Sequence, residues 1–162
     1  MDTKRGIIVA VVGAALVGLV AFAVGKWASA EEKTVTPAEY QQEIVKVRNR
    51  VDYALEQMAE SQSLDELTQN LDEAAEVARE AADDLDGMGV PDGLDDANDR
   101  LAEAFEGLAG ELTGTAATLR DPNFEDVLPQ LNSLAFPQWD AANEALADLK
   151  AAGIEVEPLS RY

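Results

Sequence analysis

Apolar side chains recur every three or four residues along most of this chain, and no other feature of the sequence restricts its fold as strongly. Residues at this spacing share one face of an α-helix, whereas a half-buried strand needs strict alternation. The spacing predicts an all-α fold with long helices. The three longest stripes are Tyr40, Ile44, Val47, Val51, Leu55 and Met58; Leu64, Leu67, Leu71, Ala74, Ala78, Ala81 and Leu85; and Leu94, Ala97, Leu101, Phe105, Leu108, Leu112 and Leu119.

Helix boundaries can be read from capping residues. The run Thr36-Pro37-Ala38-Glu39 offers an N-cap, a proline at the first helical position and the glutamate of a capping box. Ser63 and Glu66 form a second capping-box pattern. Residues 86–93 contain three glycines and a proline, which predicts a loop.

The last third of the chain predicts one short helix and one final helix. The short helix is expected over residues 123–133, interrupted by Pro129, and the final helix from about Gln138 to Ala152. Gly153 followed by Ile154 resembles a Schellman C-cap. Short connections make neighbouring helices antiparallel, so we expect an up-and-down bundle of about four helices over residues 37–154. Residues 155–162 form a tail too short for another element.

Twenty residues without a charge, Gly6 to Gly25, precede this bundle. As a helix they would extend roughly 30 Å, the thickness of a bilayer's hydrocarbon core. We therefore predict a transmembrane signal anchor over residues 6–27, with residues 1–5 as a cytoplasmic stub and residues 28–36 as a linker. Lys4 and Arg5 precede the run and only Lys26 directly follows it, so the positive-inside rule places the bundle outside the cytoplasm.

A cleaved signal peptide is the alternative reading of this segment. Ala28-Ser29-Ala30 fits the small-x-small pattern of signal peptidase, which would cut after Ala30 and release a secreted bundle. The apolar run is longer than a usual signal-peptide core, which favours retention. If the run is retained, small residues at every fourth position offer a helix-packing face, and a homo-oligomer is one possible result. That face consists of Gly6, Ala10, Ala14 and Gly18.

Charge is distributed unevenly between the two parts of the chain. The net charge is −20 overall, but residues 1–30 contain three basic residues and one acidic residue, so the remainder carries −22. Such a domain repels nucleic acid and anionic bilayer surfaces. Lys46, Arg48 and Arg50 are its only basic cluster, and we expect them to pair with acidic neighbours on adjacent helices.

Cysteine and histidine are both absent. Their absence excludes disulfides, thiolate metal sites, a catalytic cysteine and histidine-based acid–base catalysis. No phosphate-binding loop, nucleophile elbow or EF-hand pattern is present either. We therefore expect no catalytic residues, no cofactor and no metal site. Three aromatic residues, Phe124, Phe136 and Trp139, lie close together late in the chain. We expect them to form either an aromatic plug in the core or a ligand pocket.

Residues 81–112 (AADDLDGMGVPDGLDDANDRLAEAFEGLAGEL) resemble a pattern of uncharacterised exported or membrane-anchored Ala-rich helical proteins of high-GC Gram-positive bacteria. In that pattern an Ala-rich helix ends in a hydrophobic-Pro loop and a Leu/Ala helix follows. The resemblance implies a cell-envelope location and carries over no functional residues. We expect a non-catalytic, membrane-anchored interaction module, an accessory or scaffold subunit with a protein partner in the envelope. An exported small-ligand-binding or sensing bundle is the alternative.

Overall fold

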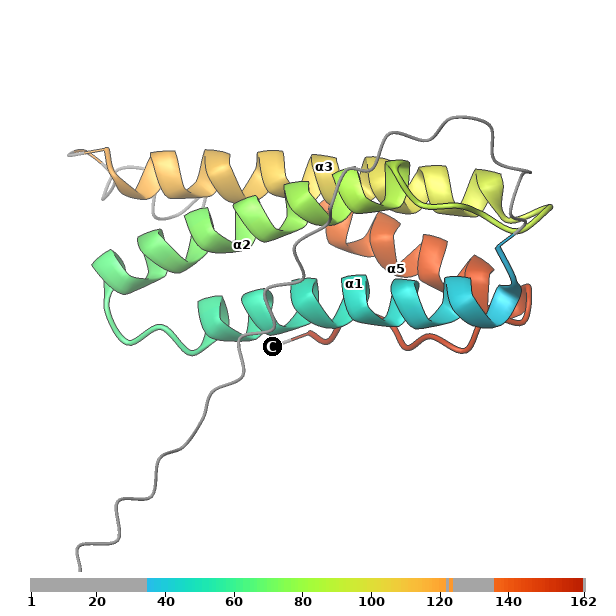
Figure 1. Ribbon diagram of the computed structural model, residues 1–162. Helices are drawn as coiled ribbons and strands as arrows, with labels where there is room; N and C mark the ends of the chain where they lie inside the picture. The colour runs from blue at the N-terminus through green and yellow to red at the C-terminus, as the bar shows by residue number, and fades with distance from the viewer. Residues whose placement is uncertain (1–34, 122, 124–135, 162) are drawn as a thin grey trace, which may run out of the picture. The chain divides into compact units, whose positions relative to one another are not determined.

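The computed structural model describes residues 35–121, 123 and 136–161, all of which belong to one compact unit, Lys33–Tyr162. Within these residues the fold is all-α, with four helices and no strand (Figure 1). This confirms the predicted helical bundle. The helices are α1 (Pro37–Ala59), α2 (Leu64–Asp86), α3 (Asp95–Leu119) and α5 (Pro137–Ala151).

Two predicted helices fall outside the described part of the chain. These are the transmembrane anchor over residues 6–27 and, apart from Asn123, the short helix over residues 123–133. Among the helices that are described, none combines the length and the hydropathy needed to cross a bilayer.

The starts of α1 and α2 follow the capping residues. At α1, the Thr36 hydroxyl accepts a hydrogen bond from the Glu39 amide, and the Glu39 carboxylate accepts one from the Thr36 amide, so the predicted capping box is complete. At α2, the Ser63 hydroxyl accepts from the Glu66 amide, but the Glu66 carboxylate bonds the amide of Gln62 instead. The second capping box is therefore only half formed, although the start of the helix is as predicted.

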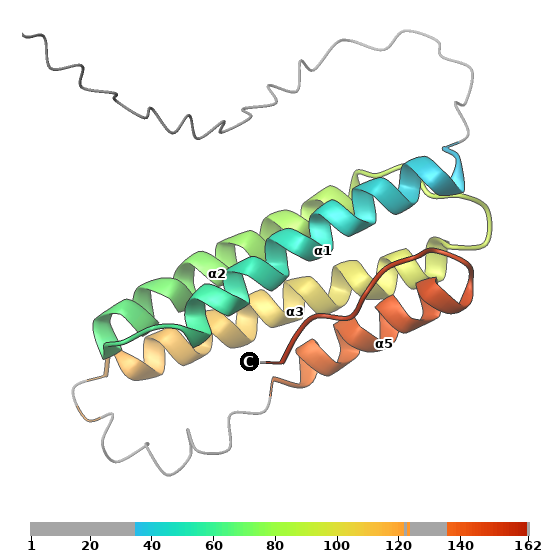
Figure 2. The same ribbon diagram turned by 90° about the horizontal axis from the view of Figure 1, so that it is seen from below.

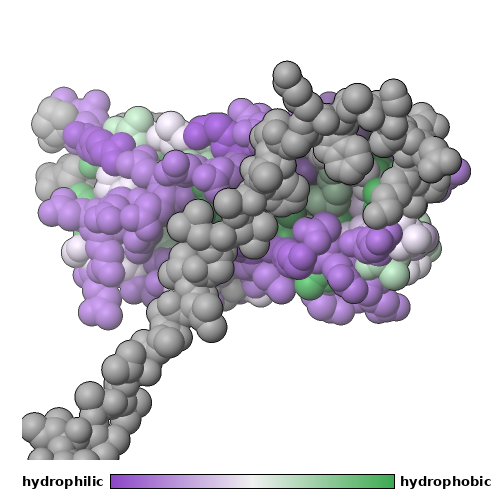
Figure 3. Space-filling model, viewed as in Figure 1, coloured by the Kyte–Doolittle hydropathy of each residue, from purple (hydrophilic) through white to green (hydrophobic). Residues whose placement is uncertain are grey.

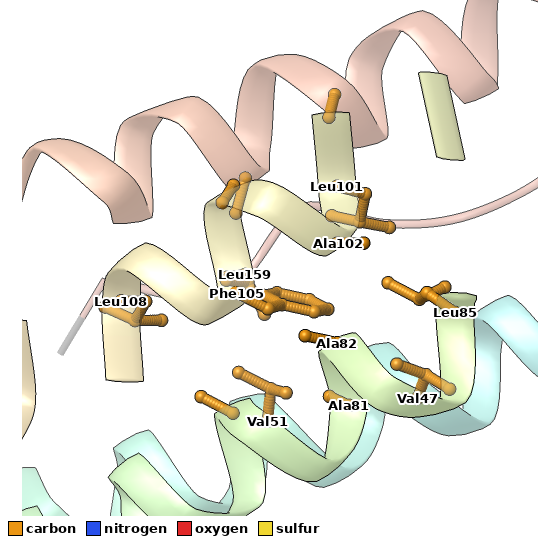
Figure 4. Packing of buried hydrophobic residues seen from close by; sticks show 14 of the residues in the cluster. Val47, Val51, Ala81, Ala82, Leu85, Leu101, Ala102, Phe105, Leu108 and Leu159 are labelled. Atoms are coloured by element: carbon orange, nitrogen blue, oxygen red, sulfur yellow. The ribbon is translucent and has the colours of Figure 1, made fainter. Parts of the chain in front are cut away.

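Alanine dominates the contact between α2 and α3, which is the most extensive helix pair. The small side chains let the two backbones approach closely, while larger residues such as Leu85, Leu101 and Phe105 fill the adjoining space (Figure 4). The other close pairs are α1 with α2 and α3 with α5. The buried alanines of α2 and α3 are Ala74, Ala75, Ala78, Ala81, Ala82, Ala97, Ala102, Ala104, Ala109 and Ala116.

The chain turns back sharply after α5. Gly153 has a positive φ of 96°, its amide donates to the Lys150 carbonyl, and the amide of Ile154 donates to the Leu149 carbonyl. These bonds confirm the predicted Schellman cap. Residues Ile154–Arg161, here called the C-terminal strap, then run between α1 and α5 (Figure 2). Val156 and Leu159 are buried, so the segment expected to be a tail contributes to the core.

One buried polar side chain connects three helices. Asn98 on α3 is 2% exposed; its side-chain oxygen accepts a hydrogen bond from the Tyr40 hydroxyl of α1 (3.0 Å). Its amide nitrogen donates to the Leu85 carbonyl near the end of α2 (3.2 Å). Burial, with Asp95 and Asp99 nearby, raises the pKa of Tyr40, so its hydroxyl keeps the proton that it donates to Asn98.

This connection can be tested by removing its members one at a time. Tyr40→Phe should lower the free energy of unfolding by about 1–2 kcal/mol, because the buried Asn98 oxygen loses its donor. Asn98→Ala should cost more, since it leaves the Tyr40 hydroxyl without a partner and also removes the hydrogen bond to the Leu85 carbonyl, which then accepts only from the main chain of its own C-cap. Urea unfolding monitored by helical circular dichroism measures both. Glu103→Ala, an exposed change on the same helix, is the control; equal costs for Asn98→Ala and Glu103→Ala would contradict the prediction.

Candidate functional site

Two of the three predicted aromatic site residues lie together at the start of α5. The rings of Phe136 and Trp139 are 6.2 Å apart between centroids and tilted by 40°. Trp139 is 9% exposed, and its indole N–H is buried without a hydrogen-bond partner among the described residues. Phe124 lies outside those residues, so whether the three form a pocket stays a prediction.

The position of this aromatic pair depends on α3. Phe136 is the N-cap of α5 and makes no side-chain cap, so a carboxylate oxygen of Glu111 accepts a hydrogen bond from the Gln138 amide instead (3.3 Å). Burial raises the pKa of Glu111, and this hydrogen bond opposes the rise. Gly107 admits the neighbouring helix, since a Cβ there would stand 2.8 Å from the Gln138 side chain. The start of α5 is thus fixed directly against α3.

The other predicted site, the helix-packing face of Gly6, Ala10, Ala14 and Gly18, lies outside the described residues.

The basic cluster on α1 forms ion pairs mainly within its own helix. Lys46 pairs with Glu43 and Arg48 with Asp52, both within α1, and only Arg50 reaches an adjacent helix, at Asp84 of α2. The expectation that all three pair between helices was therefore wrong for two, because acidic residues three or four positions away on the same helix are closer.

The side chains that line the two grooves described next do not form a catalytic or metal-binding group. A groove of ≈ 220 Å³ between α1 and α2 is mostly apolar and includes Tyr53, which is 63% exposed. A second groove, between α2 and α3, is lined by Arg79 and several carboxylates. No group of three potential metal-ligating side chains occurs in the part of the chain that the structure describes.

The seam between α1 and α5 is the most developed site. Polar side chains from both helices converge there on the main chain of the C-terminal strap, and we call this seam the strap groove. Its polar wall consists of Gln41, Arg48 and Asp52 from α1 and Asp140, Asn143 and Lys150 from α5.

Asn143 holds the strap from the α5 side. Its side-chain oxygen accepts a hydrogen bond from the Leu159 amide (2.6 Å), and its amide nitrogen donates to the Leu159 carbonyl (3.4 Å). A side-chain amide has one acceptor and one donor side, so it can pair with one residue's backbone much as a neighbouring strand would. Both backbone groups of Leu159 are therefore satisfied while its side chain, 2% exposed, enters the core.

Asp52 and Arg48 hold the strap from the α1 side. The Asp52 carboxylate accepts hydrogen bonds from the Ser160 amide (2.7 Å) and the Ser160 hydroxyl (3.2 Å). Arg48 donates to the Pro158 carbonyl (3.1 Å) and pairs with Asp52 (3.1 Å). The two charged side chains are only 13% and 14% exposed. Because their charges neutralise each other, the groove can bury both beside an uncharged backbone.

Exposed ion pairs flank the buried contacts. Lys150 pairs with Glu157 (2.9 Å), and Arg161 pairs with Asp140. Hydrogen bonding to Lys150 lowers the pKa of Glu157, and the same bond raises the pKa of Lys150. Pairs this exposed add little stability, so the buried contacts of Asn143, Asp52 and Arg48 do most to hold the strap.

Sequence reasoning missed the strap groove. Asn143, Asp52 and Gln41 look like ordinary exposed positions of amphipathic helices, and the partners of Asp52 and Gln41 lie more than 100 residues away along the chain. One signal was present, since Ile154 and Val156 alternate with glutamates as a half-buried extended segment would. Comparison of the chain with protein-family models, with curated proteins and with solved structures finds no match.

The role of Asn143 in the groove can be measured by amide hydrogen exchange. Asn143→Ala should speed the exchange of the Leu159 and Ser160 amides and lower the free energy of unfolding by about 1–2 kcal/mol, because two backbone groups lose their partner. Amides of the α2–α3 contact should be affected far less. Glu144→Ala, the exposed neighbour on α5, is the matched control. Unchanged exchange at Leu159 in Asn143→Ala would show that the side chain does not hold the strap.

Proposed function

We propose that this chain is a non-catalytic helical interaction module of the cell envelope, tethered to a membrane by residues 6–27 with its bundle outside the cytoplasm. In this role it is an accessory or scaffold subunit of a membrane complex. The tether is inferred from the length and hydropathy of the N-terminal run and from the basic residues beside it.

The observation that carries the proposal is that the polar side chains of the bundle bind one another and the backbone. Seven of the eight lysines and arginines in residues 35–121 and 136–161 form ion pairs with carboxylates. Asn98 and Asn143 connect helices and strap. Side chains used in this way position backbone segments rather than meet a substrate. The arrangement supports a rigid body that acts by presenting its surfaces.

Surface charge indicates the chemistry of the partner. Carboxylates far outnumber cations in the described residues, and hydrophilic residues cover most of the described surface seen in Figure 3. A surface of this kind attracts proteins with basic patches and is repelled by phosphate groups. The partner we propose is therefore a protein of the envelope with a basic contact surface, rather than nucleic acid or lipid headgroups.

A second function is favoured by one specific observation. The buried indole N–H of Trp139 has no acceptor among the described residues, and an unpaired buried donor costs about 1–3 kcal/mol. An exported small-ligand-binding bundle, released by cleavage after Ala30, would use this N–H to bind an acceptor on a ligand beside Phe136. We keep this as the alternative function.

Recovery of the chain from native membranes tests the first proposal. A mild-detergent pull-down should bring down the chain at its full-length mass, together with a membrane protein in stoichiometric amount that dissociates at high salt. The salt dependence follows from an acidic surface that meets a basic one. Intact mass spectrometry and quantitative gels give the readout. A chain that begins at Glu31, or one recovered alone from the soluble exported fraction, would overturn the proposal.

Ligand-dependent stabilisation tests the alternative. Aromatic compounds that carry a carbonyl should raise the melting temperature in proportion to the logarithm of their concentration, because they bind only the folded state. Trp139→Phe removes the N–H while keeping an aromatic ring and should abolish the shift. An equal shift in the wild type and in Trp139→Phe would exclude the indole N–H as the contact.

A further inference from the structure

The strap groove recognises main chain rather than particular side chains. Gln41 accepts a hydrogen bond from the Glu155 amide (2.9 Å), Arg48 donates to the Pro158 carbonyl, and Asn143 pairs with both backbone groups of Leu159. Main-chain contacts of this type are how protein grooves bind extended peptides, with apolar pockets adding specificity. Nothing in them requires the strap to belong to the same chain as the groove.

Apolar contacts give the groove its specificity. Ile154, Val156 and Leu159 are between 2% and 3% exposed and belong to the main core cluster. The same cluster includes Val47 and Val51 of α1 (Figure 4). A segment that fills the groove must therefore present aliphatic side chains at these three positions. The strap sequence itself is the one occupant that the structure shows to satisfy this requirement.

The strap fits the groove over its whole length. Contacts pair Gln41 with Glu155 and Asp52 with Ser160, so the strap runs parallel to α1. Eleven residues of helix extend about 16.5 Å, and five residues of extended chain cover about the same distance. Along α5 the order is reversed, from Lys150–Glu157 to Asp140–Arg161. The groove thus matches an extended segment in register on both walls.

A single turn joins the groove to its occupant. Gly153, at φ 96°, is the bend of that turn, and no described atom outside its neighbours lies within 4 Å of where its Cβ would be. Reorienting this residue would break the two hydrogen bonds of the Schellman cap and carry the strap, with its buried Ile154, Val156 and Leu159 side chains, out of its own groove. An exchanged pair of chains would then keep every groove contact, which is why short segments exchange between identical chains at low cost.

We propose that the strap groove accepts the C-terminal strap of a second copy of this chain, so that two chains exchange residues Ile154–Arg161 reciprocally. The inference rests on the proposed interaction role and adds a second copy, which is bound through the groove, to the basic protein, which is bound through the acidic surface. Tethering in one membrane favours the exchange, because it concentrates the chains in a plane. The exchanged dimer remakes the groove contacts of the closed chain, and the turn at Gly153 is the part that changes.

Cysteine trapping tests the exchange directly, because the natural chain contains no cysteine. Full-length Asp52→Cys and Ser160→Cys chains, each with a distinct tag, are mixed in detergent micelles and oxidised. The Asp52 carboxylate and the Ser160 hydroxyl are 3.2 Å apart in the groove, so a disulfide between chains reports a strap in its partner's groove. We expect several-fold more of this heterodimer than with Glu76→Cys, an exposed position on α2, in place of Asp52→Cys. Equal yields would overturn the proposal.

Charge reversal gives an independent test that keeps the groove's buried contacts. One chain carries Asp140→Arg with Lys150→Glu, and the other carries Glu157→Lys with Arg161→Asp. Within either chain alone, groove and strap then present like charges, and only a mixed exchanged dimer restores opposite charges at every pair. Native mass spectrometry should show a dimer of one chain of each kind that neither chain forms alone.

A mixture that remains monomeric, together with equal yields in the cysteine trapping, would rule out exchange. The broader interaction role would survive that result if the membrane pull-down still recovers a stoichiometric partner of different mass. Failure of the pull-down together with a positive exchange would instead leave a self-associating module without a separate partner. The two proposals can therefore fail separately.

Discussion

The hydrogen bonds of Asn98 set the register of the first three helices. Helices that meet through alanines have small, similar side chains at many positions, so apolar packing alone would permit several offsets along the helix axes. One buried amide that must reach Tyr40 on α1 and the Leu85 carbonyl on α2 permits one offset. Any slip would leave the buried Tyr40 hydroxyl and the buried Asn98 side chain without partners, each at a cost of about 1–3 kcal/mol. Glu111 and Gly107 fix α5 on α3 separately, so the register set by Asn98 decides where α1 faces α5 across the strap groove.

The bundle is closed by direct helix contacts at three of its seams and by an extended segment at the fourth. Close helix contacts run from α1 to α2, from α2 to α3 and from α3 to α5, whereas the seam between α1 and α5 is filled by an extended segment. Helices satisfy their own backbone groups, but an extended segment does not, so the walls of the seam must supply polar side chains. This requirement explains why Asn143, Asp52, Arg48 and Gln41 are turned toward the strap and gives the groove the character of a peptide-binding site.

The sequence predicts the helices well because their stripes and caps are local signals. Thr36, Ser63 and Gly153 mark boundaries through contacts only a few residues away. The pairing of Lys46 and Arg48 within α1 was also readable, from Glu43 and Asp52 at helical spacing. Asn98 and Asn143 were not, because an asparagine on an Ala-rich helix looks the same whether it faces water or a partner distant in sequence. The strap groove could not be predicted for this reason, since the contacts of the strap with α1 join residues separated by more than 100 positions.

That separation also fixes the order in which the molecule is completed. Contacts between neighbouring helices close short loops, whereas the strap must wait until α5 has been made and docked, and long loops close late. During synthesis, α1, α2 and α3 emerge before the strap that seals α1 against α5. Every newly made copy therefore passes through an interval in which its groove is built but unfilled. In that interval the groove is open to any segment of matching shape, including the strap of a neighbouring copy.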